Sequence, residues 1–493
     1  MKKRLGSNFL LLLVGRLVTA LIAVVSLRVM TSLLDPGEYG QWALLVAFQT
    51  FGMLFLINPV DQHVFRNTHT WWDKGFLLQH LRKYNIYILL VSLFIGAVVM
   101  CWLRWGQQAD LLTPAMTTAT GLIVGLLVYF GTWSIALSYL LNMLGFRAQS
   151  VTWMVASGLV GLLSSALLVW LHPHAISWIF GQAVGAMVGA LGALRTLSNH
   201  AIQNAGAVRR ITFSDFLNRS TIVVFCLPLA AATGLMWMQN SGYRLFVGSF
   251  WGTTELAMLV VGLGISAQLT GVIESLAMQF LYPYFARRIS DAETEVQTAG
   301  ALADLMNVLA PLYAIWAGFN AVCAAALLEI LTDARYHAAV PFVILGAMIE
   351  FMRCTTNLWS NTSRAVRRTQ GLIAPYALGA LVVWTGALAA AQFGQGLLVL
   401  STLLVLAGVA TCVAMIVLMQ RTLRISIDKP RFMVGMGVMV AAFALAVAMP
   451  VRFTGMIPNL SLLLFCGVVS GFLMIALLWR NPALSRLLST SLI

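Results

Sequence analysis

The sequence predicts an all-α integral membrane protein with about fourteen transmembrane helices. First, 60% of its 493 residues are hydrophobic and only 9% are charged, whereas a soluble protein carries roughly 25% charged residues. Second, apolar runs long enough to cross a hydrocarbon core of roughly 30 Å recur along the whole chain. Third, the basic residues lie in short segments between these runs, which is typical of membrane proteins with a fixed orientation.

The apolar runs define the predicted spans, each with the roughly 20 residues that a membrane-crossing helix needs. The seventh run is the least regular, because Asn240, Ser241 and Arg244 interrupt it. Small-residue stretches such as 181–192 favour close helix packing. The predicted spans are 8–33, 40–60, 82–104, 112–142, 149–171, 175–197, 217–239, 253–283, 300–330, 338–365, 371–392, 397–420, 432–450 and 459–479.

The loop charges set the predicted orientation. With the N-terminus in the cytoplasm, about 23 of the 30 basic residues lie on the cytoplasmic side, and the other side keeps only Arg104, Arg335 and Arg452. A missed helix would invert every later loop and destroy this asymmetry. We therefore expect an even number of spans and both termini in the cytoplasm. The net charge of +14 forms no continuous stripe, so we expect no nucleic-acid partner.

An internal repeat divides the chain. The turn at 34–43 aligns with 251–260 and places Glu38 over Glu255, and Arg147 after the fourth span aligns with Arg368 after the tenth. The repeat predicts two six-helix lobes related by a pseudo-twofold axis normal to the membrane. The predicted parts are an N-terminal lobe at 1–200, a cytoplasmic connector at 201–216, a C-terminal lobe at 217–420, and two additional helices with a tail at 421–493.

Cofactor and metal chemistry find no support in the sequence. The six cysteines are scattered without CxxC spacing, and the histidines of the predicted cytoplasmic loop 61–81 are irregularly spaced. Neither pattern predicts a disulfide framework or a metal site. Walker A, GxSxG and HExxH motifs are absent from the sequence, so ATP hydrolysis and common hydrolytic sites are not indicated. We expect no cofactor and no metal.

Several turns carry a resemblance to a known family. The residues GRL at 15–17, LLDPGEYGQW at 33–42, and the turns at Arg147 and Arg368 are similar to those of Wzx-type polysaccharide (O-antigen) flippases of the MOP (MATE-like) exporter superfamily. The resemblance covers roughly residues 5–420. It implies a transporter rather than an enzyme, which moves undecaprenyl-pyrophosphate-linked oligosaccharides across the bacterial inner membrane through a cavity between two lobes. The implied partners are that lipid-linked glycan and membrane lipids, with a polysaccharide polymerase and a chain-length regulator as further candidates.

Arginines within the predicted spans are the candidate anion-binding residues. A charged side chain near the bilayer centre costs roughly 2.5–3.5 kcal/mol on insertion scales, so such residues face polar surroundings. Arg16 lies near the middle of its span, and Arg28 and Arg244 are nearly equivalent under the repeat. A guanidinium fork suits a pyrophosphate or a sugar carboxylate. We predict that Arg16, Arg28, Arg244 and Arg353 bind substrate; the alternative for Arg28 and Arg244 is snorkelling to the outer headgroups.

The tenth span carries a polar stripe. Glu350, Arg353, Cys354, Asn357 and Asn361 share one helix face. Glu350 and Arg353 can pair across one turn, so the stripe is either a structural ion pair or a wall that contacts the glycan or exchanges ion-pair partners during transport. Arg353 and Asn357 are therefore candidates for substrate binding, and Glu350 is a candidate for ion coupling.

Glu274 is the main candidate for ion coupling. It follows Ser266 and Thr270 at steps of four residues, and no basic residue lies within a turn or two of it on its own helix. A lone carboxyl in an apolar span is favoured in its protonated form. The structural alternative is a hydrogen bond from that acid to a neighbouring helix. Asp61 and Asp304, at the cytoplasmic ends of their spans, are the further candidates.

Two other classes of function stay open. A drug or cation exporter of the same superfamily favours a cavity with excess carboxylate, whereas four arginines against Glu274 and Glu350 favour an anionic cargo. A polysaccharide polymerase or ligase needs a sizeable outer loop, and the predicted outer loops hold about ten residues or fewer. We therefore expect a flippase that works by alternating access and is coupled to an ion gradient.

Overall fold

The structure is a computed structural model that describes residues 2–105, 113–202, 212–218, 221–290, 292–366, 369–448, 453 and 455–489. Within these ranges the regular elements are all helical. Fourteen segments are long and apolar enough to cross a membrane, so the predicted all-α fold with about fourteen spans is confirmed. Arg368 and the connector residues 203–211 lie outside the described residues.

Contacts divide the chain into two compact units. Unit 1 is Met1–Thr254 and unit 2 is Glu255–Ile493. The seventh span, Thr221–Phe250, packs within unit 1, whereas the repeat in the sequence assigns it to the second half. The division into two symmetric lobes stays a prediction.

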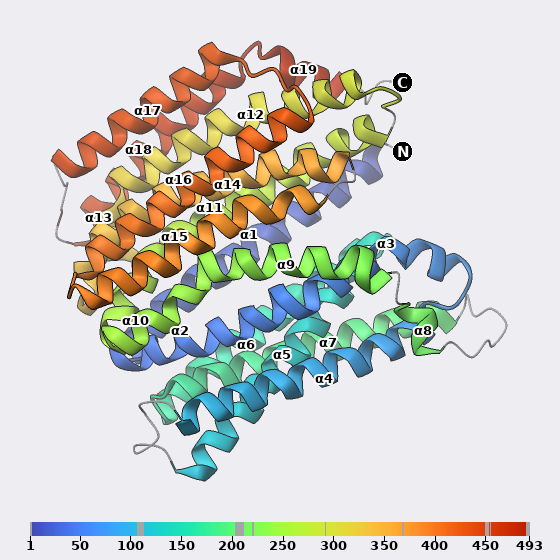
Figure 1. Cartoon of the computed structure of the whole chain (residues 1–493), viewed down its shortest axis with the longest axis vertical. Helices are drawn as coiled ribbons and strands as arrows, with labels where there is room; N and C mark the ends of the chain where they lie inside the picture. Colours follow the sequence, from blue (N-terminus) through green and yellow to red (C-terminus); the bar gives the residue numbers. More distant parts are fainter. Residues whose placement is uncertain are drawn as a thin grey trace. The chain divides into compact units, whose positions relative to one another are not determined.

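Unit 1 contains the first seven spans (Figure 1). The first is α1 (Lys2–Leu33), and the second joins α2 (Pro36–Phe51), the π-helical η1 (Gly52–Ile57) and α3 (Asn58–Asp73). The next four are α4 (Leu77–Trp105), α5 (Pro114–Met143), α6 (Arg147–Leu171) and α7 (Ala175–Ile202). After the short α8 (Phe213–Phe216), the seventh consists of η2 (Thr221–Cys226), α9 (Leu227–Trp237), η3 (Met238–Gly242) and α10 (Tyr243–Phe250).

Small residues bring the helices of unit 1 together. A Cβ atom added at Gly185 of α7 would lie 2.4 Å from the Cα atom of Gly161 in α6, and one added at Gly181 would lie 2.3 Å from the Cα atom of Ser165. Because lipid tails are as apolar as leucine, close backbone approach rather than water exclusion stabilises such pairs. The predicted role of the stretch 181–192 in close packing is confirmed.

The segment 61–81, for which the sequence predicts a loop with an amphipathic, interfacial character, is mostly helical. The helix α3 continues the second span to Asp73, and α4 begins at Leu77, so the turn between them is short. Val60, Val64 and Thr68 are buried along one face of α3. This buried face packs against α4. The residues on the other faces are polar, which made the segment resemble a loop.

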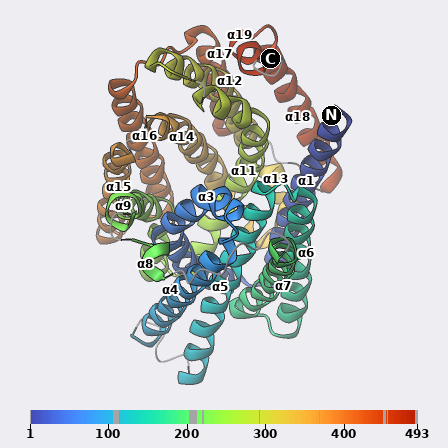
Figure 2. The ribbon, with the colours of Figure 1, turned by 90° about the vertical axis from the view of Figure 1, so that its right-hand side faces the viewer.

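Unit 2 contains α11 (Thr253–Ser290) from Glu255 on, α12 (Glu295–Val322), α13 (Ala324–Leu331), η4 (Ala334–Ala339), α14 (Val340–Ala365), η5 (Thr369–Leu372), α15 (Ile373–Gln392), α16 (Leu397–Thr422), α17 (Lys429–Ala448), α18 (Met456–Leu478) and α19 (Pro482–Ser489). Its centre is α12, which packs against α14, α17, α18 and α19. Figure 2 shows α17 and α19 beside α12. The two C-terminal spans that the sequence left without a role therefore brace α12.

Candidate functional site

Four polar side chains meet inside unit 2. Glu274 comes from α11, and Glu350, Arg353 and Asn357 come from α14. Arg353 donates from Nη2 to Glu274 Oε2 at 2.8 Å and from Nε to Glu350 Oε2 at 2.8 Å. Asn357 Nδ2 donates to Glu274 Oε1 at 3.1 Å. We call these four residues the unit 2 cluster.

The cluster forms because α11 and α14 approach closely. A Cβ atom added at Gly346 of α14 would lie 3.1 Å from the Cα atom of Leu263 in α11. Beside it, Ser266 Oγ donates to the backbone oxygen of Val343 at 2.8 Å. Small residues and a helix-to-helix hydrogen bond fix such pairs in a membrane. Glu274 follows Ser266 by about two turns of α11 and so lies beside Arg353.

The unit 2 cluster carries one negative charge in excess when all its groups are ionised, because two carboxylates share one guanidinium. The side chains of Glu274, Glu350 and Arg353 are 21%, 10% and 29% exposed. Tyr313 of α12 and Tyr376 of α15 lie near enough to interact electrostatically with Arg353. An uncompensated charge in such a place is costly, so the cluster attracts a cation or a proton.

Two expectations about these residues have different outcomes. The predicted pairing of Glu350 with Arg353 across one turn is confirmed. The prediction that Glu274 is a lone carboxyl is wrong, because Arg353 reaches it from another helix. A count of basic residues along one helix cannot detect a partner that lies 79 positions away.

The three candidate arginines of unit 1 differ in their surroundings. Arg16, on α1, is half-buried, and no hydrogen bond or ion pair joins its guanidinium to any described residue. Arg28 is exposed, about 18 Å further along α1 and turned by about 120° from Arg16. Arg244 is the second residue of α10 and lies close to Tyr39; its buried Nε finds no partner in the described part of the chain. A single phosphate cannot bridge Arg16 and Arg28, so they would act at different depths.

The two aspartate candidates have unlike surroundings. Asp61 is buried and accepts a hydrogen bond from the hydroxyl of Tyr84. Asp304 is also buried, but it pairs with Arg288 of α11 at 2.7 Å and with Arg486 of α19 at 2.6 Å. The hydrogen bond to Asp304 raises the pKa of Arg486. Arg486 was not recognised in the sequence, because 182 residues separate it from Asp304.

The turn that carries the family resemblance has a structural role. Glu38 Oε2 accepts the backbone N–H of Ala175 at 2.7 Å and so caps the start of α7. Gly40 has no room for a side chain, since a Cβ atom there would overlap the backbone oxygen of Thr253. Glu38 also lines a cavity of about 270 Å³ between α2, α4, α5 and α7, whose walls are mostly apolar. Among the described residues, no group of three or more His, Cys, Asp or Glu side chains could hold a metal.

Comparisons with known proteins agree on family and fold. A family model described as "Polysaccharide biosynthesis protein" matches residues 29–341. The structure of "Lipid II flippase MurJ, inward closed conformation" matches with a TM-score of 0.67 and 11% identity, covering 96% of this chain and 98% of that chain. A MATE structure in the bent conformation matches with a TM-score of 0.51 and 11% identity over 88% and 95% of the two chains.

A eukaryotic MATE transporter, AtDTX14, matches with a TM-score of 0.50 and 14% identity over 87% and 94% of the two chains. At these identities the solved structures show a common fold. No curated protein sequence matches this chain.

Proposed function

The chain belongs to the family of polysaccharide biosynthesis proteins, and from that premise we propose that it is a flippase for undecaprenyl-pyrophosphate-linked oligosaccharide repeat units. It would move them from the inner to the outer leaflet of the bacterial cytoplasmic membrane, for the synthesis of O-antigen, capsule or exopolysaccharide. The family match carries this proposal. The multi-pass fold supports it, because the MurJ structure that it resembles is named as a lipid II flippase. Family and fold are those of transporters, not enzymes.

The cargo's anionic groups would bind to the arginines of unit 1. Arg16 has an unengaged guanidinium and Arg244 a buried Nε without a partner among the described residues. A guanidinium that is poorly solvated gains most from a bidentate bond to phosphate or carboxylate. Arg28 would serve as a second contact near the outer end of α1. Arg353 and Asn357 remain candidates for substrate binding, but the cargo must compete there with Glu274 and Glu350.

Ion coupling would take place at the unit 2 cluster. Its single excess negative charge matches one proton or one monovalent cation. Uptake of that cation from outside and its release inside would favour the outward step of an anionic cargo by alternating access. Glu274 is the group that we expect to bind the ion, because its two partners come from another helix and can separate from it. Glu350 would keep Arg353 in place, while Asp61 and Asp304 stay candidates.

A second function also finds support in one observation. An exporter of organic cations favours excess carboxylate, and the unit 2 cluster has it. The three arginines of unit 1 argue for an anionic cargo. The proposed orientation has both termini in the cytoplasm. A polysaccharide polymerase and a chain-length regulator of the same membrane are candidate partners.

Deletion of the gene tests the two functions against each other. We expect lipid-linked oligosaccharide to accumulate in the inner leaflet of the deletion strain, and the natural chain to restore export. Sensitivity to cationic dyes should stay unchanged. A strain that keeps normal polymer export but accumulates cationic dyes would reject the flippase in favour of the cation exporter.

A further inference from the structure

Asp61 is a buried carboxyl without a cationic partner. It is 9% exposed, and Tyr84, which donates its hydroxyl hydrogen bond to Asp61, is fully buried. No Lys, Arg or His within the described ranges forms an ion pair with it. Asp61 thus has the isolation that the sequence wrongly predicted for Glu274. An ionised carboxylate in such a place keeps a desolvation cost that no counter-ion among the described residues offsets.

The titratable groups that the described parts of the neighbouring helices bring near Asp61 are tyrosines, a cysteine and a histidine. Tyr84 and Tyr87 come from α4, and Cys226 of η2 lies near Tyr87. The ring of His80, also on α4, stacks on Trp71 with centroids 3.9 Å apart. Tyr139 of α5 packs on Phe65 of α3 with ring centroids 5.5 Å apart. The helix α9, which also contacts α3, contains no titratable residue.

Two groups on α3 itself could supply positive charge. His63 Nε2 lies 3.0 Å from the backbone oxygen of Phe216, which engages it elsewhere. Arg66 is exposed and, five residues on, points about 140° away around the helix. Neither neutralises Asp61.

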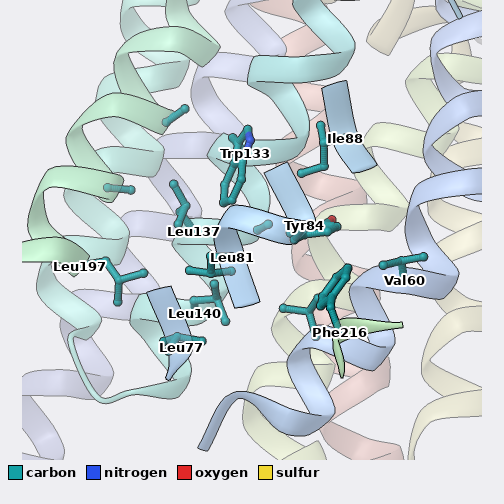
Figure 3. Close-up of a cluster of buried hydrophobic side chains, with 14 of the residues drawn as sticks. Val60, Leu77, Leu81, Tyr84, Ile88, Trp133, Leu137, Leu140, Leu197 and Phe216 are labelled. Carbon is teal, nitrogen blue, oxygen red and sulfur yellow. The ribbon is translucent and has the colours of Figure 1, made fainter. Parts of the chain in front are cut away.

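The short helix α8, which precedes the seventh span, also packs beside Tyr84. Phe216 of α8 is 1% exposed, and its ring centroid lies 6.1 Å from that of Tyr84 and 6.2 Å from that of Trp71. Figure 3 shows Phe216 close to Tyr84 and Val60. Tyr84 therefore contacts Asp61 with its hydroxyl and Phe216 with its ring.

We propose that Asp61 is a proton-binding site whose protonated form keeps Phe216 seated against Tyr84. The neutral acid fits the dry pocket with the tyrosine as its partner. The carboxylate requires more water than the 9% exposure of Asp61 provides, and separation of Tyr84 from Phe216 would supply it. Loss of the proton would thereby release α8 from α4. This site is separate from the unit 2 cluster and does not depend on the cargo.

The sign of the effect follows from proton linkage. The seated form binds one proton more than the open form, so raising the pH favours the open form. Between the pKa of Asp61 in the open form and its pKa in the seated form, each further pH unit lowers the ratio of seated to open molecules about tenfold. Asp61→Asn removes the titration and keeps a neutral group of the same shape, so it should hold Phe216 in place at every pH.

Hydrogen exchange and infrared spectroscopy on the full chain in lipid nanodiscs test the proposal. In the natural chain, exchange of the 212–218 backbone, corrected for its intrinsic pH dependence, should accelerate about tenfold per pH unit. A protonated-carboxyl C=O band should persist over that range and disappear at the pH where the acceleration levels off. Both changes should be absent in Asp61→Asn and present in Asp73→Asn, the control at the exposed end of α3.

Exchange at 212–218 that stays constant with pH in the natural chain would overturn the proposal, and this result does not depend on any variant folding. A pH-dependent carboxyl band that is as strong in Asp61→Asn as in the natural chain would overturn it too, since the acids of the unit 2 cluster are the same in both. Because neither measurement involves transport, a negative result leaves the proposed flippase untouched, and failure of the flippase assay leaves Asp61 untouched.

Discussion

Removing Arg353 should destabilise unit 2 more than any other single charge change in α14. Arg353→Ala leaves the carboxylates of Glu274 and Glu350 near each other without the guanidinium that each now contacts at 2.8 Å. Breaking one buried pair by removing a partner costs roughly 3–5 kcal/mol. All three side chains are less than a third exposed, so solvent offsets only part of this, and we expect a loss of about 3 kcal/mol or more.

The assay is unfolding of the purified chain in mixed detergent at neutral pH. The control is Arg364→Ala, which removes an exposed arginine of the same helix and should cost less than about 0.5 kcal/mol. The variant with Arg353→Ala, Glu274→Gln and Glu350→Gln has no unpaired charge and should recover most of the loss. Because protonation neutralises the two carboxyls, the loss from Arg353→Ala should also shrink as the pH falls. Equal stability of Arg353→Ala and Arg364→Ala would refute the reasoning.

Three further outcomes follow from the contacts above. Glu274→Gln should abolish the dependence of export on the ion gradient while the chain still inserts. Export is measured at clamped pH and membrane potential, with Glu255→Gln as the exposed control on the same helix. Unchanged dependence would count against Glu274 as the ion site. Arg16→Ala should reduce export at least tenfold with normal membrane insertion, whereas Arg66→Ala should leave export unchanged. Normal polymer export by Arg16→Ala removes that residue from the site. Asp304→Asn should free α19 from α12, because two arginines lose their carboxylate. Protease digestion should then remove the C-terminal residues faster. In the control Asp428→Asn these residues should stay protected.

Local patterns in the sequence predicted what depends on one helix at a time. The fourteen spans follow from run length and hydropathy, which the membrane thickness imposes directly. The ion pair of Glu350 with Arg353 follows from the period of the helix, which places residues three apart on one face. Small residues at 181–192 likewise predicted close packing of that helix, although not that its partner is α6.

Contacts between helices escaped the same reasoning. The partner of Glu274 lies on α14 and that of Asp304 on α19, and helical periodicity identifies a polar face without identifying the face opposite it. The surroundings of the carboxyl candidates differ from the prediction for that reason. Glu274, which is isolated along its own helix, is paired in space, whereas Asp61 has only a tyrosine hydroxyl. The sequence predicted an amphipathic segment at 61–81 but not that α3 continues the second span, because its buried stripe is short and its other faces are polar.

The most direct test of the account is movement of a pyrophosphate lipid by the purified chain. In proteoliposomes with a fluorescent undecaprenyl-pyrophosphate oligosaccharide, we predict leaflet exchange that the natural chain supports and Arg16→Ala does not. Exchange that Arg16→Ala supports as well as the natural chain, or transport of an organic cation with no movement of the lipid, would contradict it.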